Sequence, residues 1–497
     1  MSQLFRKKSV DALIEASQEE GRGLSRSLGA WSLVALGIGA VIGSGIFTLV
    51  GTAAAGEVRS FESFLHVPLL DLITQGSNSS FTFGRPGAGP GVALSFLLTA
   101  IACGFAALCY AEMACAIPVA GSAYTYTYAT LGELTAWMIG WNLILEYAVS
   151  NMAVAVGFSA YFNDILQALF GFQLPPQLSE PIYAGGELTG AWFNLPAFLI
   201  LMLLTWILVH GIKESARTNN VMVLVKVGAI LIFIFGAMKA VNTSNWTPFM
   251  PNGMSGVMTG AAIVFFTYIG FDSVSTAAEE CRNPKRDLPI GIIGTLLVCS
   301  VLYIGVALVL TGIAPWNTLG NAAPVAGALK ALGMETVRKW VGAGAIVGMI
   351  SSLMVFQYGQ ARVWFAMSRD GLLPRAFSRV HPKYKSPHVS TWIAGFAVGL
   401  PAGVWDIGTF ADLSSIGTLA AFIVVGAGVL ILRKTDPDRP RSFRVPFGPV
   451  IPVLSILSCL TLMTALPAEA WVRFVFWSIL GLAIYFLYGK KRSALAR

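Results

Sequence analysis

The chain has 497 residues, of which 55% are hydrophobic and only 12% are charged, and its mean hydropathy is +0.70. This composition excludes an ordinary soluble domain, in which about 25% of the residues are charged. The formal net charge of +8 does not indicate a nucleic-acid partner, because the Lys and Arg residues gather beside long apolar segments, as they do in membrane proteins.

A helix needs about 20 apolar residues to cross the hydrocarbon core of a bilayer. The sequence predicts twelve such helices within one membrane domain, residues 31–488. They are expected at residues 31–56, 90–116, 132–160, 194–211, 218–238, 254–278, 288–313, 340–366, 389–405, 410–432, 449–467 and 471–488. The first stretch is too long for the apolar region of a signal peptide, so we expect it to remain as the first span.

Polar and charged residues fill the segment before the first span, residues 1–30. Within it, Val10, Leu13 and Ile14 share one face of a short amphipathic helix that we expect at the membrane surface. Basic clusters on the same predicted side occur at residues 6–8, 362–385, 433–444 and 490–492. The positive-inside rule therefore predicts a multi-pass plasma membrane protein whose N-terminus and C-terminal tail, residues 489–497, are cytoplasmic. These clusters also make anionic lipid an expected contact.

The middle of the first span, residues 37–47, reads GIGAVIGSGIF. Each glycine weakens a helix by about 1 kcal/mol relative to alanine. Small residues also allow membrane helices to pack closely, so this motif by itself fits either close packing or a helix break that lines a cavity.

A second interruption is predicted in the sixth span, where residues 261–280 read AAIVFFTYIGFDSVSTAAEE. The two interruptions begin two five-span repeats of opposite predicted orientation, at about residues 31–238 and 254–432, and two extra helices follow at 449–488. Paired breaks of this kind are typical of inverted repeats with a binding site at the bilayer midplane. The backbone N–H groups of Gly43, Ser44 and Gly45 are then expected to bind an anion, such as a carboxylate, at the positive end of a half-helix.

Lys226 lies within the apolar stretch NNVMVLVKVGAILIFIF, with no acidic residue within one helical turn in the sequence. An ionisable group inside a span usually faces a functional interior. Because burial disfavours the charged form of an ammonium group, we expect Lys226 to carry a proton in place of a bound sodium ion. The alternative is that its long side chain reaches the inner membrane surface.

Three acidic residues also lie within or near the ends of predicted spans. Glu146 is expected to hold a cationic group of a ligand or to pair with Lys226, with a structural hydrogen bond as the alternative. Asp272 follows the second interruption and is expected either to face the same cavity or to cap the second half-helix. Glu112, near the inner end of the second span, is expected to be a structural or gating anchor.

The residue types of an enzyme active site are missing from the span interiors. All four histidines, His66, His210, His381 and His388, fall in loops or at span ends, and the six cysteines form no CxxC pair. No nucleophile-elbow or zinc-protease motif occurs either. The sequence therefore predicts neither an enzyme nor a cofactor or metal site.

Three stretches of the sequence resemble those of a known family. The stretches GIGAVIGSGIF, FFTYIGFDSVSTAAEECRNPKRDLP at residues 265–289 and FAMSRDGLLP at 365–374 are similar to the amino acid–polyamine–organocation superfamily, and within it to bacterial cationic amino acid transporters. Residues 109–147 and 211–226 fit as well. The resemblance implies an all-α polytopic fold of twelve transmembrane helices. In this LeuT-like arrangement, two repeats of five helices are inverted relative to each other, helices 1 and 6 are broken, and two helices are added at the C-terminus.

The resemblance also implies where a substrate binds. Its α-carboxylate is expected at the first break, from Ile42 to Gly45, and its α-amino group at backbone carbonyls of Ala40, Phe266 and Ile269.

The same resemblance assigns roles to the buried charges. Lys226 matches the position at which proton-coupled relatives keep a lysine, and Glu146 and Asp272 are expected beside the side-chain pocket.

We therefore expect a proton-coupled importer of L-amino acids that works by alternating access. The alternatives are a proton-independent exchanger or uniporter and, from another class, an amino acid sensor. Two pocket carboxylates suit a cationic substrate such as arginine or lysine. Bulky residues of the eighth span, Met349, Met354 and Phe356, suit a small neutral substrate such as alanine, so both substrate classes remain open.

Overall fold

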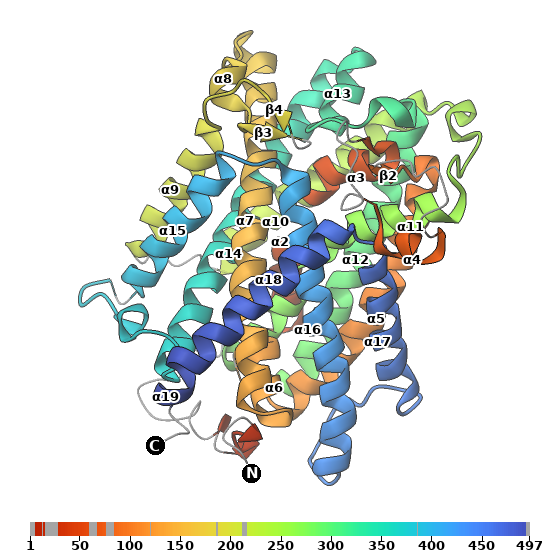
Figure 1. The fold of residues 1–497 in the computed structure, drawn as a ribbon. Helices are drawn as coiled ribbons and strands as arrows, with labels where there is room; N and C mark the ends of the chain where they lie inside the picture. The colour runs from red at the N-terminus through yellow and green to blue at the C-terminus, as the bar shows by residue number, and fades with distance from the viewer. Residues whose placement is uncertain are drawn as a thin grey trace.

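A computed structural model describes residues 5–11, 13–14, 28–58, 67–75, 84–119, 121–184, 187–210, 216–384 and 386–493. Long helices run roughly side by side and form one bundle (Figure 1). In chain order they are α2 (Ala30–Val41), α3 (Gly45–Ala55), α5 (Val92–Ala116), α7 (Glu133–Phe170), α9 (Leu195–Val209), α10 (Ala216–Ala237), α11 (Gly253–Val264), α12 (Pro284–Ile313), α14 (Glu335–Arg369), α15 (His388–Ala402), α16 (Ile407–Thr435), α17 (Val450–Thr464) and α18 (Ala468–Ile484).

Eight of the described helices are long and apolar enough to cross a membrane, and α2 with α3 makes a ninth if the pair is one span. The chain is thus a multi-pass membrane protein. Three shorter helices, α9, α15 and α17, have 15 residues each. Every stretch that the sequence predicts as a span contains a helix, while the count of twelve crossings stays a prediction.

The first span is interrupted where its glycines cluster. Helices α2 and α3 are bent by 50° at a short break, and residues 42–44 between them are not helical. The interruption expected from the sequence is therefore present in the first span.

The sixth span is interrupted as well. After α11, the 3-10 helix η7 (Phe265–Tyr268) ends at Ile269, which is extended, and Gly270 follows with φ of 118°. A side chain at this φ is strained, so glycine suits the position. The chain continues as the 3-10 helix η8 (Phe271–Glu280).

Several short elements connect the long helices. Strands β1 (Gly56–Val58) and β2 (Gly84–Pro86) pair antiparallel with Glu57 opposite Arg85, and β3 (Tyr183–Ala184) pairs with β4 (Glu187–Leu188). The other short elements are α4 (Leu69–Gln75), η4 (Gly89–Gly91), α6 (Ser122–Thr130), α8 (Pro176–Ser179), η5 (Met238–Ala240), η6 (Thr243–Trp246), η9 (Trp316–Thr318), α13 (Pro324–Ala331), η10 (Arg375–Ser378), η11 (Tyr485–Gly489) and α19 (Lys490–Arg492). β2, β3, β4, α8 and α13 lie at the end of the bundle opposite α19 (Figure 1).

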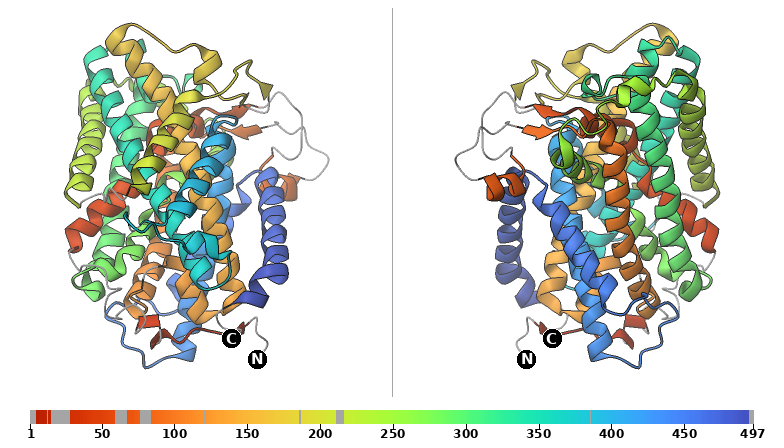
Figure 2. Two further views of the ribbon diagram at one scale, coloured as in Figure 1. Left: turned by 90° about the vertical axis from the view of Figure 1, so that its left-hand side faces the viewer. Right: turned by 90° about the vertical axis from the view of Figure 1, so that its right-hand side faces the viewer.

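The centre of the bundle is formed by α7 and by the broken sixth span. In each of these two spans, 83% of the most apolar 18-residue segment is buried, against 17% of the corresponding segment in the span that contains α18. Both views in Figure 2 show α18 at the edge of the molecule. Helix α7 is longer than the sequence predicts, because it continues to Phe170 and ends only where Gly171 adopts a left-handed conformation.

Both ends of the described chain meet at Glu133, the first residue of α7. The Glu133 N–H donates to the carbonyl oxygen of Arg6 at 3.0 Å, and the Ser493 hydroxyl donates to the Glu133 carboxylate at 2.6 Å. In the segment before the first span, Val10 is buried and Leu13 and Ile14 pack against the core. The apolar face predicted there thus covers protein, while most of residues 15–30 lie outside the described ranges.

Candidate functional site

The two helix breaks lie against each other. A Cβ atom built on Gly270 would be 3.1 Å from the Cβ atom of Ala40, so glycine is what allows this close approach. The hydroxyl oxygen of Tyr303, on α12, lies 3.0 Å from the carbonyl oxygens of both Val41 and Thr267. This single hydroxyl group therefore joins the first break to the second.

Lys226 reaches the first break from α10. Its side chain is fully buried, and its ammonium nitrogen donates to the carbonyl oxygens of Gly39 at 2.6 Å and Ile42 at 2.9 Å. In an unbroken helix the Gly39 carbonyl would accept the N–H of Gly43, but that N–H donates to Val41 at 3.0 Å. Lys226 thus replaces a backbone donor that the break removes, as a buried carbonyl requires.

Ser352 on α14 contacts the same carbonyl groups as Lys226. Its hydroxyl oxygen lies 3.2 Å from the Gly39 carbonyl oxygen and 3.1 Å from that of Ile42. Helix α14 can approach because Gly348 has no side chain, and a Cβ atom there would be 3.3 Å from the Cβ atom of Lys226. Helices α10 and α14 therefore pack against each other and both contact the broken backbone.

The N-terminus of α3 faces the break with free donors. Within the described ranges, no acceptor takes the backbone N–H of Ser44, Gly45 or Ile46, and the buried Ser44 hydroxyl also has no partner there. The positive end of the helix dipole adds to these donors. The sequence predicted Gly43 as the first of these donors, but its N–H is already bonded to the Val41 carbonyl oxygen. The free donors therefore begin at Ser44.

Gly45 also serves close packing. A Cβ atom at this position would lie 2.7 Å from the Cγ2 atom of Thr267 on η7. The same holds for Gly37, where a Cβ atom would meet the Thr295 hydroxyl at 2.1 Å. Close packing thus accounts for Gly37, while Gly45 both packs closely and belongs to the helix start at the break.

Glu146 and Asp272 lie together beside the breaks. Both are buried, and their carboxyl groups are close enough to interact electrostatically with each other and with Tyr110 and Tyr147. The Tyr110 hydroxyl group has no hydrogen-bond partner in the described part of the chain. A buried polar group of this kind usually bonds to water or to a ligand.

The backbone carbonyl groups that the resemblance assigns to the substrate ammonium group lie at the two breaks. Ala40 is in the last turn of α2, and Phe266 and Ile269 flank the second break. The Ile269 N–H donates to the Phe266 carbonyl oxygen at 3.2 Å, which leaves that oxygen a second lone pair.

Glu112 does not belong to this cluster. Its carboxylate accepts two hydrogen bonds from the Arg433 guanidinium group and one from the Val445 N–H. With its oxygens held in this way, Glu112 is a structural anchor between α5 and the end of α16, as the sequence indicated.

Buried amide side chains on α7 and α14 were not predicted from the sequence as part of the site. Asn151 on α7 donates to Gln357 at 3.2 Å, and Gln357 donates to Thr205 at 3.0 Å. Gln360 is fully buried, and neither end of its amide has a partner among the described residues. Two glutamines in an otherwise apolar span were the signal that pointed to this polar interior.

Bulky side chains of α14 are buried, and one of them lies next to Tyr147 of the carboxyl cluster. Met349, Met354 and Phe356 are all buried, and the Phe356 ring centroid lies 6.1 Å from that of Tyr147. Their effect on substrate size stays a prediction.

Arg85 ties the end of α3 to α16. Its guanidinium group donates to Asp412 at 2.6 Å and to Glu57 at 2.8 Å. Burial alone would lower the pKa of Arg85, but the charges of Asp412 and Glu57 outweigh burial and raise the pKa above its usual value. These ion pairs give a structural role to part of the connection between α3 and α5.

Comparison with known proteins adds the family. A family model described as "Amino acid permease" matches residues 28–486. The chain is similar to a methylthioribose transporter of Bacillus subtilis, with 46% identity over 100% of both chains. It is 47% identical to a branched-chain amino acid permease of the same organism over 99% of each chain. A chloroplastic cationic amino acid transporter of Arabidopsis thaliana is 38% identical over 85% of this chain and 69% of its own length.

Proposed function

Because the chain belongs to the amino acid permease family of the amino acid–polyamine–organocation superfamily, we propose that it imports neutral L-amino acids together with protons by alternating access. Family membership itself makes the chain a multi-pass transporter and not an enzyme. The proton coupling, the substrate's side chain and the plasma membrane orientation are the parts that we propose.

The proposed architecture has twelve spans in two inverted five-helix repeats, followed by α17 and α18. The paired interruptions support it, because they fall in the first and sixth predicted spans and touch at Ala40 and Gly270. In transporters of this kind the substrate binds where two broken helices meet.

In the proposed binding mode, the substrate carboxylate bonds to the N–H groups of Ser44, Gly45 and Ile46. The absence of protein acceptors for these donors in the described part of the chain supports this mode, as does the general affinity of helix N-termini for anions. The substrate ammonium group then bonds to the carbonyl oxygens of Ala40, Phe266 and Ile269.

Coupling to protons is assigned to Lys226. The observation that carries this proposal is its pair of bonds to Gly39 and Ile42, which attach a titratable group directly to the break. A charged donor makes a hydrogen bond roughly twice as strong as a neutral one. Loss of the proton therefore weakens the contact of α10 with the first span and favours opening of the bundle toward the other side.

The proposed side-chain preference is for neutral aliphatic amino acids. It is supported by the branched-chain amino acid permease that is 47% identical over nearly the whole chain, and by the buried methionines of α14. The paired carboxyl groups of Glu146 and Asp272 would suit a cationic side chain, and arginine is therefore included in the test.

A second candidate substrate is methylthioribose, because a transporter of that compound is 46% identical over the full length. Methylthioribose has no carboxylate or ammonium group, so it would leave the donors at the start of α3 without a charged partner.

Counterflow in proteoliposomes tests the substrate. Vesicles loaded with unlabelled valine, alanine, arginine or methylthioribose are diluted into the same compound in labelled form. The proposal predicts accumulation of valine and alanine. Accumulation of arginine alone or of methylthioribose alone would overturn the neutral amino acid assignment and leave the family unchanged.

A further inference from the structure

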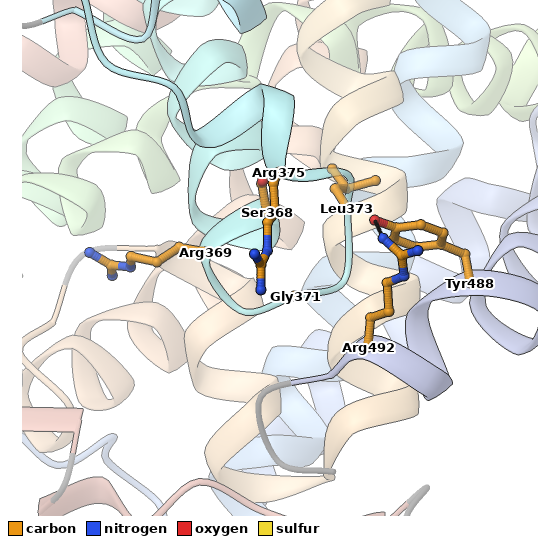
Figure 3. A pocket seen from close by; sticks show the side chains of 7 residues that line it. All are labelled: Ser368, Arg369, Gly371, Leu373, Arg375, Tyr488 and Arg492. Atoms are coloured by element: carbon orange, nitrogen blue, oxygen red, sulfur yellow. Dashed lines mark hydrogen bonds between the residues drawn. The ribbon is translucent and has the colours of Figure 1, made fainter. Parts of the chain in front are cut away.

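A basic pocket of about 450 Å³ lies at the end of the bundle where both chain ends meet. It is bounded by the end of α14 and the turn after it on one side, and by η11 and α19 on the other (Figure 3). The lining residues that matter here are Ser368, Arg369, Leu373, Arg375, Tyr488 and Arg492. None of the lining residues is acidic.

The positive charges of this pocket have few partners. The guanidinium groups of Arg369 and Arg375 make no hydrogen bond or ion pair within the described ranges, and Arg492 bonds only to the Tyr488 hydroxyl oxygen, at 3.2 Å. The acid next to Arg369, Asp370, is already paired with Lys8 at 2.9 Å. The like charges of Arg375 and Arg492 face one hollow from two sides (Figure 3) and repel each other, and a bound anion would relieve that repulsion.

The helix on one side of the pocket, α18 with η11, also carries exposed apolar side chains. The side chains of Phe476, Ile479 and Leu487 along α18 and η11 are 69%, 59% and 74% exposed, and their spacing places them on one helix face. Tyr488 follows directly and carries Arg492 over its ring, 4.7 Å from the centroid. An aromatic residue next to a basic one is typical of the level at which lipid headgroups lie.

We propose that this pocket binds the phosphate group of an anionic phospholipid, with Arg375 and Arg492 on either side of the phosphate and the acyl chains along the exposed face of α18. The charged hollow supplies the phosphate contacts. The exposed apolar side chains of the same helix distinguish a phospholipid from free phosphate, since only a lipid uses both surfaces. The site is separate from the helix breaks and from the transport proposal.

Native mass spectrometry of the full chain in detergent tests the proposal. The probes are phosphatidylglycerol, phosphatidylcholine and inorganic phosphate. The wild-type protein should retain phosphatidylglycerol after washing, and the double variant Arg375→Gln/Arg492→Gln should lose at least about tenfold in its affinity, because each arginine near an anionic surface contributes on the order of 1 kcal/mol. Arg375→Lys/Arg492→Lys keeps the charge and should retain part of the binding.

The matched control is Lys239→Gln/Lys339→Gln, which removes two exposed charges outside the pocket and should bind phosphatidylglycerol as the wild type does. Equal retention of this lipid by the glutamine double variant, in protein that stays monodisperse, would overturn the proposal. Equal retention of phosphatidylcholine would do so as well. Displacement of the lipid by inorganic phosphate at low concentration would instead identify a site for free phosphate and contradict the lipid assignment.

Discussion

The ammonium nitrogen of Lys226 lies 2.6 Å from the carbonyl oxygen of Gly39, a carbonyl that the break in the first span has released from its helical partner. The charge on α10 and the backbone of the break therefore stabilise each other. A proton gained or lost at Lys226 changes the contacts of the first span directly, without an intervening side chain.

Removal of the Tyr303 hydroxyl group should reduce uptake more than the loss of one ordinary hydrogen bond would. Tyr303→Phe removes the contact between Val41 and Thr267, and we expect uptake to fall about tenfold while stability falls by about 1 kcal/mol, the usual worth of one hydrogen bond. Tyr268→Phe is the matched control, because its hydroxyl group donates to the Phe96 carbonyl oxygen on α5 at 3.1 Å. Equal loss of uptake in both variants would contradict a special role for Tyr303.

Gly43→Leu should abolish substrate binding. A Cβ atom at Gly43 would lie 3.1 Å from the Ser352 hydroxyl oxygen, so a leucine there must displace α14 or fill the space next to the donors of α3. Binding is measured by the shift in thermal unfolding that valine produces. Gly228→Leu is the control, since nothing lies within 4 Å of a Cβ atom at Gly228. An unchanged valine shift in Gly43→Leu would return this glycine to a packing role.

Arg85→Gln should destabilise the protein strongly. The substitution leaves Asp412 buried without its charged partner, and loss of one member of a buried ion pair costs about 3–5 kcal/mol. Thermal unfolding in detergent measures the effect. The more exposed pair of Arg473 and Glu469 provides the comparison, because Arg473→Gln should cost about 1 kcal/mol or less. Similar losses in both variants would show that the Arg85 contacts add no special stability.

Glu146→Gln separates the two substrate classes. If the substrate is neutral, valine counterflow by the variant should stay within about threefold of the wild-type rate. Glu146 then contributes at most a hydrogen bond to an uncharged group, which is worth about 1 kcal/mol or less. If Glu146 binds a cationic side chain, arginine counterflow would fall far more than valine counterflow. Strong arginine counterflow in the wild type that Glu146→Gln abolishes would contradict the neutral assignment.

The extent of sequence-based prediction differs between the parts of the site. The length of the apolar stretches located the helices, and the four glycines of residues 37–45 marked the position of the first break, because both signals are local in the sequence. The contact of Arg85 with Asp412 joins residues 327 positions apart, and no local pattern announces it. Likewise, the sequence placed Lys226 in an apolar span, but only the packing of α10 against α2 identifies Gly39 and Ile42 as its acceptors.

Proton coupling through Lys226 is tested most directly by uptake of labelled valine into proteoliposomes, with an inward proton gradient, a clamped membrane potential and no sodium. The wild type should concentrate valine only with the gradient. Lys226→Met should lose this stimulation while valine still shifts its thermal unfolding. Gradient-driven accumulation by Lys226→Met would contradict the proposed role of this lysine. Valine counterflow by the wild type without any accumulation along the proton gradient would make the protein an exchanger or facilitator.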